Sequence, residues 1–263
     1  MTKKGKTKNS FYILGVIPAR FASTRLMGKP LADIGGKSLL QHTYEGACTS
    51  KLMNQVVIAV DDEQVAKVVK SFGAAAIMTP KDCATGSDRI AIAAKEFPKA
   101  NIIVNIQGDE PFISGMMIDQ AIEPLLFDPD VNVSTLAKRI DNVRELKSSS
   151  VVKVVFDYKN FALYFSRSQI PFVRDAQSDT EALESADFYK HIGLYVYRKE
   201  YLIKFTQLES TDLENWEKLE QLRMLENGFK IKIVETEFDS FSVDTPEDLE
   251  KARRIYSKLK KMS

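Results

Sequence analysis

The sequence predicts an α/β protein, a three-layer Rossmann-like fold with a mostly parallel central sheet. Two observations predict it. Short, continuously apolar runs, such as residues 11–18, 55–60 and 101–106, are typical of strands buried on both faces. Segments with helical spacing of apolar residues separate these runs. Strand–helix–strand repetition implies parallel strands joined by right-handed crossovers, with helices on both faces of the sheet.

The expected elements of the first half alternate regularly. Gly73 and Pro98 follow two of the helical segments and are typical helix-stop residues. Strands are expected at 11–18, 55–60, 74–78, 101–106 and 131–140, and helices at 37–50, 62–73, 86–97 and 115–127.

The pattern changes after residue 150. Residues 151–166 predict a hairpin with a polar turn at 157–160, and the polar segment 174–187 predicts a loop. The expected later elements are a strand at 191–197, one helix at 212–228, a strand at 230–237 and a C-terminal helix within 243–260. Thr245 would cap that last helix and Pro246 would take its first position. The predicted organisation is a basic disordered tail at 1–10 and a single domain at 11–263, with a smaller subdomain at about 151–200.

Composition limits the partners and the compartment. The chain has 263 residues, 44% of them hydrophobic, and a net charge of only +1, which argues against nucleic acid as a partner. Two cysteines without metal-ligand spacing fit a reducing, cytoplasmic location. The basic start and the apolar run "FYILGVI" mimic a signal peptide. The run is short, however, and Pro18 and Arg20 follow it at once, so a tail leading into a strand is the better interpretation. No apolar stretch is long enough for membrane insertion.

Polar residues gather after three of the expected strands, where ligands bind in open parallel sheets. The first cluster surrounds Lys29, the second follows residue 106, and the third precedes the C-terminal helix. Their members are Arg20, Ser23, Thr24, Arg25 and Lys29; Gln107, Asp109 and Glu110; and Asp244.

The first cluster suits a triphosphate, because guanidinium groups grip phosphate oxygens and Lys29 adds a point charge. The alternative is a solvated loop with salt bridges. The "GKP" at 28–30 is not a P-loop: the first glycine of that motif is missing, and Pro30 cannot bind magnesium as Ser or Thr would. Metal ligands must therefore lie elsewhere.

Asp109 and Asp244, together with phosphate oxygens and water, would form a usual Mg²⁺ shell. Each residue also has an ordinary explanation. Asp109 could be a turn residue in "GDEP". Asp244 could be a helix cap, because "DTPED" is good capping chemistry by itself.

Seven motifs occur in the order "PARFASTRLMGKPL", "TGSDR", "VNIQGDEP", "ALYFSR", "HIGLYVYR", "LEQLR" and "VDTPEDL". Together they resemble the 3-deoxy-manno-octulosonate (Kdo) cytidylyltransferases over nearly the whole chain after the tail. The first motif is shared in looser form with sialic acid cytidylyltransferases. The combination of motifs is much more specific to the Kdo cytidylyltransferases.

The resemblance implies a nucleotidyltransferase fold and an Mg²⁺-dependent reaction in which CTP and Kdo give CMP-Kdo and pyrophosphate, activating Kdo for lipopolysaccharide biosynthesis. It also implies a homodimer formed in part by the hairpin region. The implied catalytic residues are Lys29, Asp109 and Asp244, of which the two aspartates hold the metal. The implied CTP-binding residues are Arg20, Ser23, Arg25, Lys29, Gly86, Ser87, Arg89 and Gln107. The implied Kdo-binding residues are Gln107, Arg167, His191, Tyr195, Glu220 and Gln221.

The chemistry of these side chains agrees with that division. Arg167 suits a sugar carboxylate, and the other five suit hydroxyl groups. Without the resemblance, a solvated helix face is the favoured interpretation of Glu220 and Gln221, whereas His191 could equally be a structural histidine and Tyr195 could simply be core. Two rival functions remain: a synthetase for another CMP-sugar acid, and a non-catalytic nucleotide- or sugar-binding regulator on the same fold.

Overall fold

The computed structural model describes residues 11–21 and 26–262, and within these ranges nine strands form one sheet. The predicted tail at 1–10 lies outside the described residues. The main strands, in sheet order, are β11 (Lys232–Glu235), β7 (Val133–Arg139), β10 (Tyr189–Arg198), β6 (Ile102–Asn105), β1 (Ile13–Ala19), β4 (Gln55–Val60) and β5 (Ala75–Met78). The hairpin β8 (Lys153–Phe156) and β9 (Ala162–Ser166) joins the sheet through β10. Two-residue strands β2 (Asp33–Ile34) and β3 (Lys37–Ser38) form a separate ribbon.

The predicted mostly parallel sheet is confirmed. The strands β6, β1, β4 and β5 run parallel to one another, as β7 and β11 do. Only β10, among the seven main strands, is antiparallel to its neighbours, and it lies between β6 and β7. The hairpin expected at 151–166 is also present, with its turn between β8 and β9.

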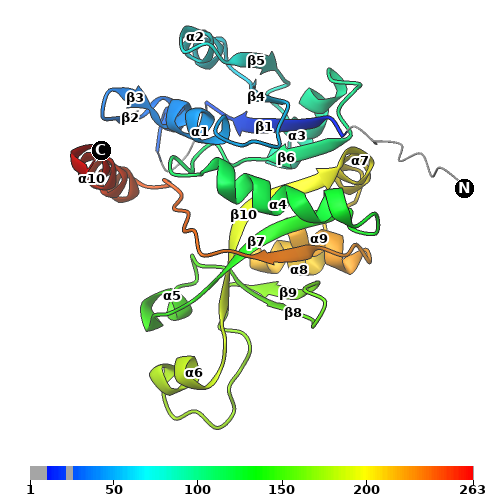
Figure 1. Cartoon of the computed structure of the whole chain (residues 1–263), viewed down its shortest axis with the longest axis vertical. Helices are drawn as coiled ribbons and strands as arrows, with labels where there is room; N and C mark the ends of the chain where they lie inside the picture. The colour runs from blue at the N-terminus through cyan, green and yellow to red at the C-terminus, as the bar shows by residue number, and fades with distance from the viewer. Residues whose placement is uncertain (1–10, 22–25, 263) are drawn as a thin grey trace, which may run out of the picture.

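Helices cover both faces of the sheet (Figure 1). The helices α1 (Leu39–Ala47), α2 (Glu63–Ser71) and α4 (Gly115–Phe127) pack on one face, and α3 (Gly86–Lys95), α7 (Lys199–Thr206) and α9 (Gln221–Glu226) on the other. The remaining helices are the 3-10 turn η1 (Lys29–Leu31), α5 (Val143–Lys147), α6 (Asp179–Ser185), α8 (Asp212–Glu217) and α10 (Pro246–Met262).

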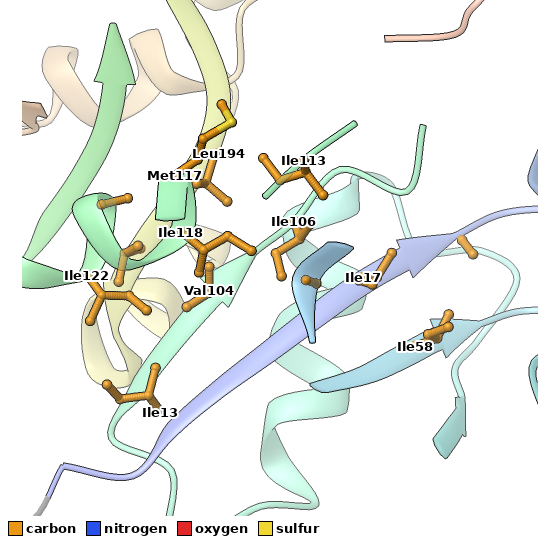
Figure 2. Close-up of a cluster of buried hydrophobic side chains, with 14 of the residues drawn as sticks. Ile13, Ile17, Ile58, Val104, Ile106, Ile113, Met117, Ile118, Ile122 and Leu194 are labelled. Carbon is orange, nitrogen blue, oxygen red and sulfur yellow. The ribbon is translucent and has the colours of Figure 1, made fainter. Parts of the chain in front are cut away.

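Alternation along β1 divides the core in two. Ile13 and Ile17 point into the first cluster, to which Ile106 and Ile118 also belong (Figure 2), whereas Leu14 and Val16 point into the second. A strand that is apolar on both faces needs a helix layer on each side, so the continuous apolar run in the sequence predicted this arrangement.

Polar side chains set where several helices begin. Ser38, Asp62 and Ser114 each accept a hydrogen bond from a first-turn amide of α1, α2 and α4. Thr85 and Asp88 form a capping box that begins α3, and this places Gly86 and Ser87 at the carboxyl-end edge of the sheet.

Two sequence expectations were wrong. The single helix expected at 212–228 is two helices, α8 and α9, separated by Lys218 in the left-handed conformation (φ 53°). The polar loop expected at 174–187 contains α6, whose cap is Ser178. The subdomain boundary expected at about 151–200 stays a prediction.

Candidate active site

Three of the predicted residues meet at one point although they are far apart in the sequence. Lys29 begins η1, Asp109 follows β6, and Asp244 lies two residues before α10. The Nζ atom of Lys29 donates to Oδ2 of Asp109 at 2.5 Å and to Oδ1 of Asp244 at 2.7 Å. The lysine side chain is only 15% exposed. The two carboxylates therefore converge on a single positive charge.

Electrostatics favours a cation at this point. Burial alone would lower the pKa of Lys29, but the neighbouring Asp109 and Asp244 carboxylates outweigh burial and raise it above its ordinary value. Two carboxylates that already bind one cation through oxygen atoms form a donor set that suits Mg²⁺, which prefers oxygen ligands and keeps several waters. The residues present therefore fit the predicted metal.

The segment 236–245 holds Asp244 beside Asp109. The Val243 amide donates to the Asp109 carbonyl at 2.9 Å, and Ser240 Oγ donates to the buried Glu110 carboxylate at 2.6 Å. Burial raises the pKa of Glu110 to about 7. Thr245 and Asp248 exchange the capping bonds at the start of α10, so Oδ1 of Asp244 is available to accept from Lys29.

Six predicted residues line a cavity of about 190 Å³ beside this cluster. They come from the start of α3, the end of β6, β10 and the start of α9, and the turn 107–109 joins the cavity to Asp109. These residues are Ser87, Gln107, His191, Tyr195, Glu220 and Gln221.

The strand β10 supplies one wall of the cavity through alternate residues. His191, Gly193, Tyr195 and Tyr197 all face it. Among the described residues, the buried Tyr195 hydroxyl has no hydrogen-bond partner, so it is available to a ligand. Burial lowers the pKa of His191 to about 3, which keeps the imidazole neutral at physiological pH.

Ser87 and Glu220 connect the two helices at the cavity. Ser87 Oγ donates to Oε2 of Glu220 at 2.9 Å. Burial raises the pKa of Glu220, although its bonds to Thr85 and Ser87 oppose the change. Gln221 is buried, so this segment is not the solvated helix face that spacing alone suggested.

Two predicted arginines make other contacts. Arg89 is fully buried, where it pairs with Asp61 at 3.0 Å and also donates to Thr79. The guanidinium of Arg167 donates to the backbone carbonyls of Ser149, Glu217 and Lys218, and this residue is not among those that line the cavity. Both side chains are thus bound to protein groups in this structure.

The remaining predicted residues concern the phosphate loop and the start of α3. Arg20 is half-buried directly after β1, at the carboxyl end of the strand, and Gly86 is the first residue of α3. Ser23 and Arg25 lie outside the described residues.

Sequence reasoning gave no role to several residues of the cavity. The signal for Gly193 and Tyr197 was present, because both share the alternating face of His191 and Tyr195. Asn105 is a polar residue inside an apolar strand and bonds to Gln107 at 3.2 Å. The residues without an assigned role are Asn105, Gly193, Tyr197, Phe205, Leu219 and Met224.

Known proteins are similar to this chain over nearly its whole length. A family model described as "Cytidylyltransferase" matches residues 14–233. The 3-deoxy-manno-octulosonate cytidylyltransferase of Solibacter usitatus is 51% identical over 93% of this chain and 94% of its own. The protein of the same name from Pelobacter propionicus is 52% identical over 93% of this chain and 97% of its own. The chain belongs to the 3-deoxy-manno-octulosonate cytidylyltransferase family.

Solved structures agree with this membership. A structure described as CMP:2-keto-3-deoxy-manno-octonic acid synthetase complexed with CTP matches with a TM-score of 0.87 and 40% identity, over 94% of this chain and 99% of that one. A cytidylyltransferase from Leptospira borgpetersenii matches with a TM-score of 0.62 at 19% identity, over 95% of this chain and 88% of that one, and it supports the fold alone. In the described part of this family member, no helix is long and apolar enough to cross a membrane.

Proposed function

We propose that this protein transfers the CMP group of CTP to the anomeric hydroxyl of Kdo, giving CMP-Kdo and pyrophosphate. The proposal rests on one observation: the turn 107–109 joins the Lys29 cluster to the cavity. The Lys29–Asp109–Asp244 cluster can hold charged phosphates and a metal, and the cavity offers polar groups to a polyhydroxylated sugar. Gln107 lines the cavity and Asp109, two residues later, belongs to the cluster, so the two substrates can meet there.

The reaction is a displacement at the α-phosphorus of CTP. The sugar hydroxyl attacks and gives its proton to water, a new O–P bond forms, the bond from the α-phosphorus to the α–β bridging oxygen breaks, and pyrophosphate leaves. No covalent nucleophile is required, because the chain acts by positioning both substrates and stabilising negative charge. Lys29 would place its charge against phosphate oxygens, with Arg20, Ser23 and Arg25 as further phosphate contacts. Gly86 and Ser87 would meet the cytosine.

A bound Mg²⁺ would be held by Asp109 and Asp244. It would supply Lewis acidity and neutralise charge on the phosphates. Lys29 balances the charge of the two carboxylates.

The cavity would hold the sugar. Gln107, His191, Tyr195, Glu220 and Gln221 offer donors and acceptors for hydroxyl groups. Arg167 remains the proposed partner of the Kdo carboxylate. That contact requires its guanidinium to exchange at least one of its present carbonyl bonds for the ligand. We also propose a cytoplasmic homodimer in which the β8–β9 hairpin takes part.

The test is pyrophosphate release from CTP in the presence of Mg²⁺, measured with Kdo, sialic acid and other 2-keto sugar acids. Release with Kdo at a kcat/KM well above that for the other acids is the expected result. A preference for another acid would favour a different CMP-sugar synthetase. Binding of CTP and Kdo without any release would show a non-catalytic regulator instead.

A further inference from the structure

We propose that Thr135, a buried residue outside the cavity wall, positions His191 by fixing which ring nitrogen carries the proton. His191 then presents an unprotonated Nδ1 as an acceptor for a sugar hydroxyl group. This inference rests on the proposed function for the identity of the sugar. The assignment of the proton does not, and can be measured on the free enzyme.

The first step is the location of Thr135. It lies in β7 opposite Tyr195 of β10 and is fully buried. The register between the two strands shifts between Ile192 and Tyr195, which is a bulge in β10. Residues in a bulge lose regular ladder partners, so their carbonyl groups need other donors. The Thr135 hydroxyl lies 2.8 Å from the Leu194 carbonyl oxygen and 3.1 Å from that of Ile192.

The second step follows the single hydroxyl proton. Oγ1 of Thr135 also lies 2.9 Å from Nε2 of His191. Carbonyl oxygens only accept, so the hydroxyl donates toward the carbonyl oxygens of the bulge. If it donated to the ring instead, its lone pairs would face both carbonyl oxygens inside the core. His191 must therefore carry its proton on Nε2 and donate it to Thr135.

The third step is the consequence for Nδ1. Burial keeps the ring neutral, and a neutral imidazole protonated on Nε2 leaves Nδ1 as an acceptor. Among the described residues no protein group bonds to Nδ1, and the side chain lines the cavity. Aromatic rings hold the imidazole in place: Phe165 at 5.0 Å in an edge-on contact, and Tyr195 at 5.3 Å between ring centroids. The site therefore selects a ligand group that donates a hydrogen bond here.

The direct test is nuclear magnetic resonance of the free enzyme labelled with ¹⁵N-histidine. The chain has two histidines, so His191→Gln assigns the signals. At pH 7 we expect His191 to be neutral, with the proton on Nε2. Addition of Kdo with a non-hydrolysable CTP analogue should shift Nδ1 while Nε2 stays protonated. A proton on Nδ1, a charged ring, or an Nδ1 signal that ignores the ligands would overturn the inference.

Variants separate positioning from structure. Thr135→Val removes the hydroxyl and keeps the shape. It should mix the tautomers of His191 and raise KM for Kdo about tenfold, the equivalent of one hydrogen bond, with KM for CTP unchanged. Thr135→Ser restores the hydroxyl and should restore both readouts. Ser134 lies on the opposite face of β7, where its buried hydroxyl bonds to the Ala121 carbonyl. Ser134→Ala removes that hydroxyl and should change neither the tautomers of His191 nor KM for Kdo.

If Thr135→Val fails to fold, the tautomers of the wild type and of Thr135→Ser still decide the question. Equal KM for Kdo in Thr135→Val and the wild type would overturn the positioning role. A preference for another sugar acid, with the Nε2 tautomer intact, would count against the proposed function only.

Discussion

At the scale of single residues, Lys29 is bound by two acidic groups that would repel each other without it. The distances of 2.5 and 2.7 Å to Asp109 and Asp244 leave little freedom for the ammonium group. In the proposed reaction this charge would serve two purposes. It would keep the two carboxylates in place, and it would stabilise phosphate charge during transfer.

The substitution Lys29→Met tests both purposes, because methionine keeps much of the side-chain volume without the charge. We expect kcat to fall by about 100-fold or more, a usual effect of losing one preorganised charge contact. Mg²⁺ should also raise the melting temperature more in the variant than in the wild type, since only the metal would then separate the carboxylates. Pyrophosphate release and thermal unfolding with and without Mg²⁺ measure the two effects. The exposed pair Lys37–Glu45 supplies the control, Lys37→Met. A kcat of Lys29→Met within twofold of the wild type would contradict the proposed role of Lys29.

His191 gives a pH dependence whose sign follows from its lowered pKa. The folded protein holds the ring neutral down to about pH 3, whereas the unfolded chain binds a proton below about pH 6.5. Between these values the unfolded state binds more protons, so the free energy of unfolding decreases as pH falls from 6.5.

At pH 5 this loss should reach up to about 2 kcal/mol relative to pH 7.5, and His191→Gln should not show it. Urea unfolding of both proteins at pH 5, 6 and 7.5 measures the difference, and the other titrating groups largely cancel. Parallel pH curves for the two proteins would show that the ring is not held neutral.

At the scale of secondary structure, the sequence predicted elements well where local chemistry decides them. The helix stop at Pro98 and the apolar run at 55–60 are local signals, and α3 and β4 appear as expected. Lys218 is different. Nothing in its residue type predicts the left-handed conformation that it adopts at the end of α8. The break is what lets Leu219 and Glu220 turn toward the cavity.

The substitution Lys218→Gly should relieve the cost of that conformation. A non-glycine residue at φ 53° loses about 1 kcal/mol, and part of the gain from glycine is offset by greater freedom in the unfolded chain. We therefore expect a net stabilisation of about 0.5 kcal/mol, measured by urea unfolding. Lys204→Gly, inside α7, should instead destabilise by about 1 kcal/mol. If Lys218→Gly lowered the free energy of unfolding as much as Lys204→Gly does, Lys218 would not be strained.

At the scale of the whole molecule, the candidate site was predictable as a set of residues but not as a geometry. Lys29, Asp109 and Asp244 were each recognised from motifs, yet their meeting depends on long-range topology that spacing does not contain. The antiparallel insertion of β10 between β6 and β7 is equally non-local, and it brings His191 and Tyr195 beside Gln107. Arg89 is fully buried, and its position near the nucleotide, which the resemblance implies, stays a prediction.

Arg89 links three segments that follow the carboxyl ends of β1, β4 and β5. Its guanidinium, on α3, bonds to Thr79 and to Asp61 at the end of β4. Asp61 in turn accepts from the Phe21 amide at 3.0 Å, in the loop after β1. A buried charge that loses its only partner of opposite sign is costly, so this pair should act as a unit.

The double-mutant cycle of Asp61→Asn and Arg89→Met tests that unit. Asp61→Asn leaves the buried guanidinium without its counter-charge and should cost about 3–5 kcal/mol, whereas the double variant should cost less than the sum of the single variants by about 1–3 kcal/mol. Both single variants should also raise KM for CTP more than KM for Kdo, because the Phe21 amide, next to Arg20, loses its place against Asp61. Urea unfolding and steady-state kinetics give the two readouts.

The exposed pair Arg253–Glu250 is the control, and its cycle should give less than about 1 kcal/mol of coupling. Additive losses in the free energy of unfolding for Asp61→Asn and Arg89→Met would show that the two residues are not coupled. An unchanged KM for CTP would mean that their pairing affects stability and not CTP binding.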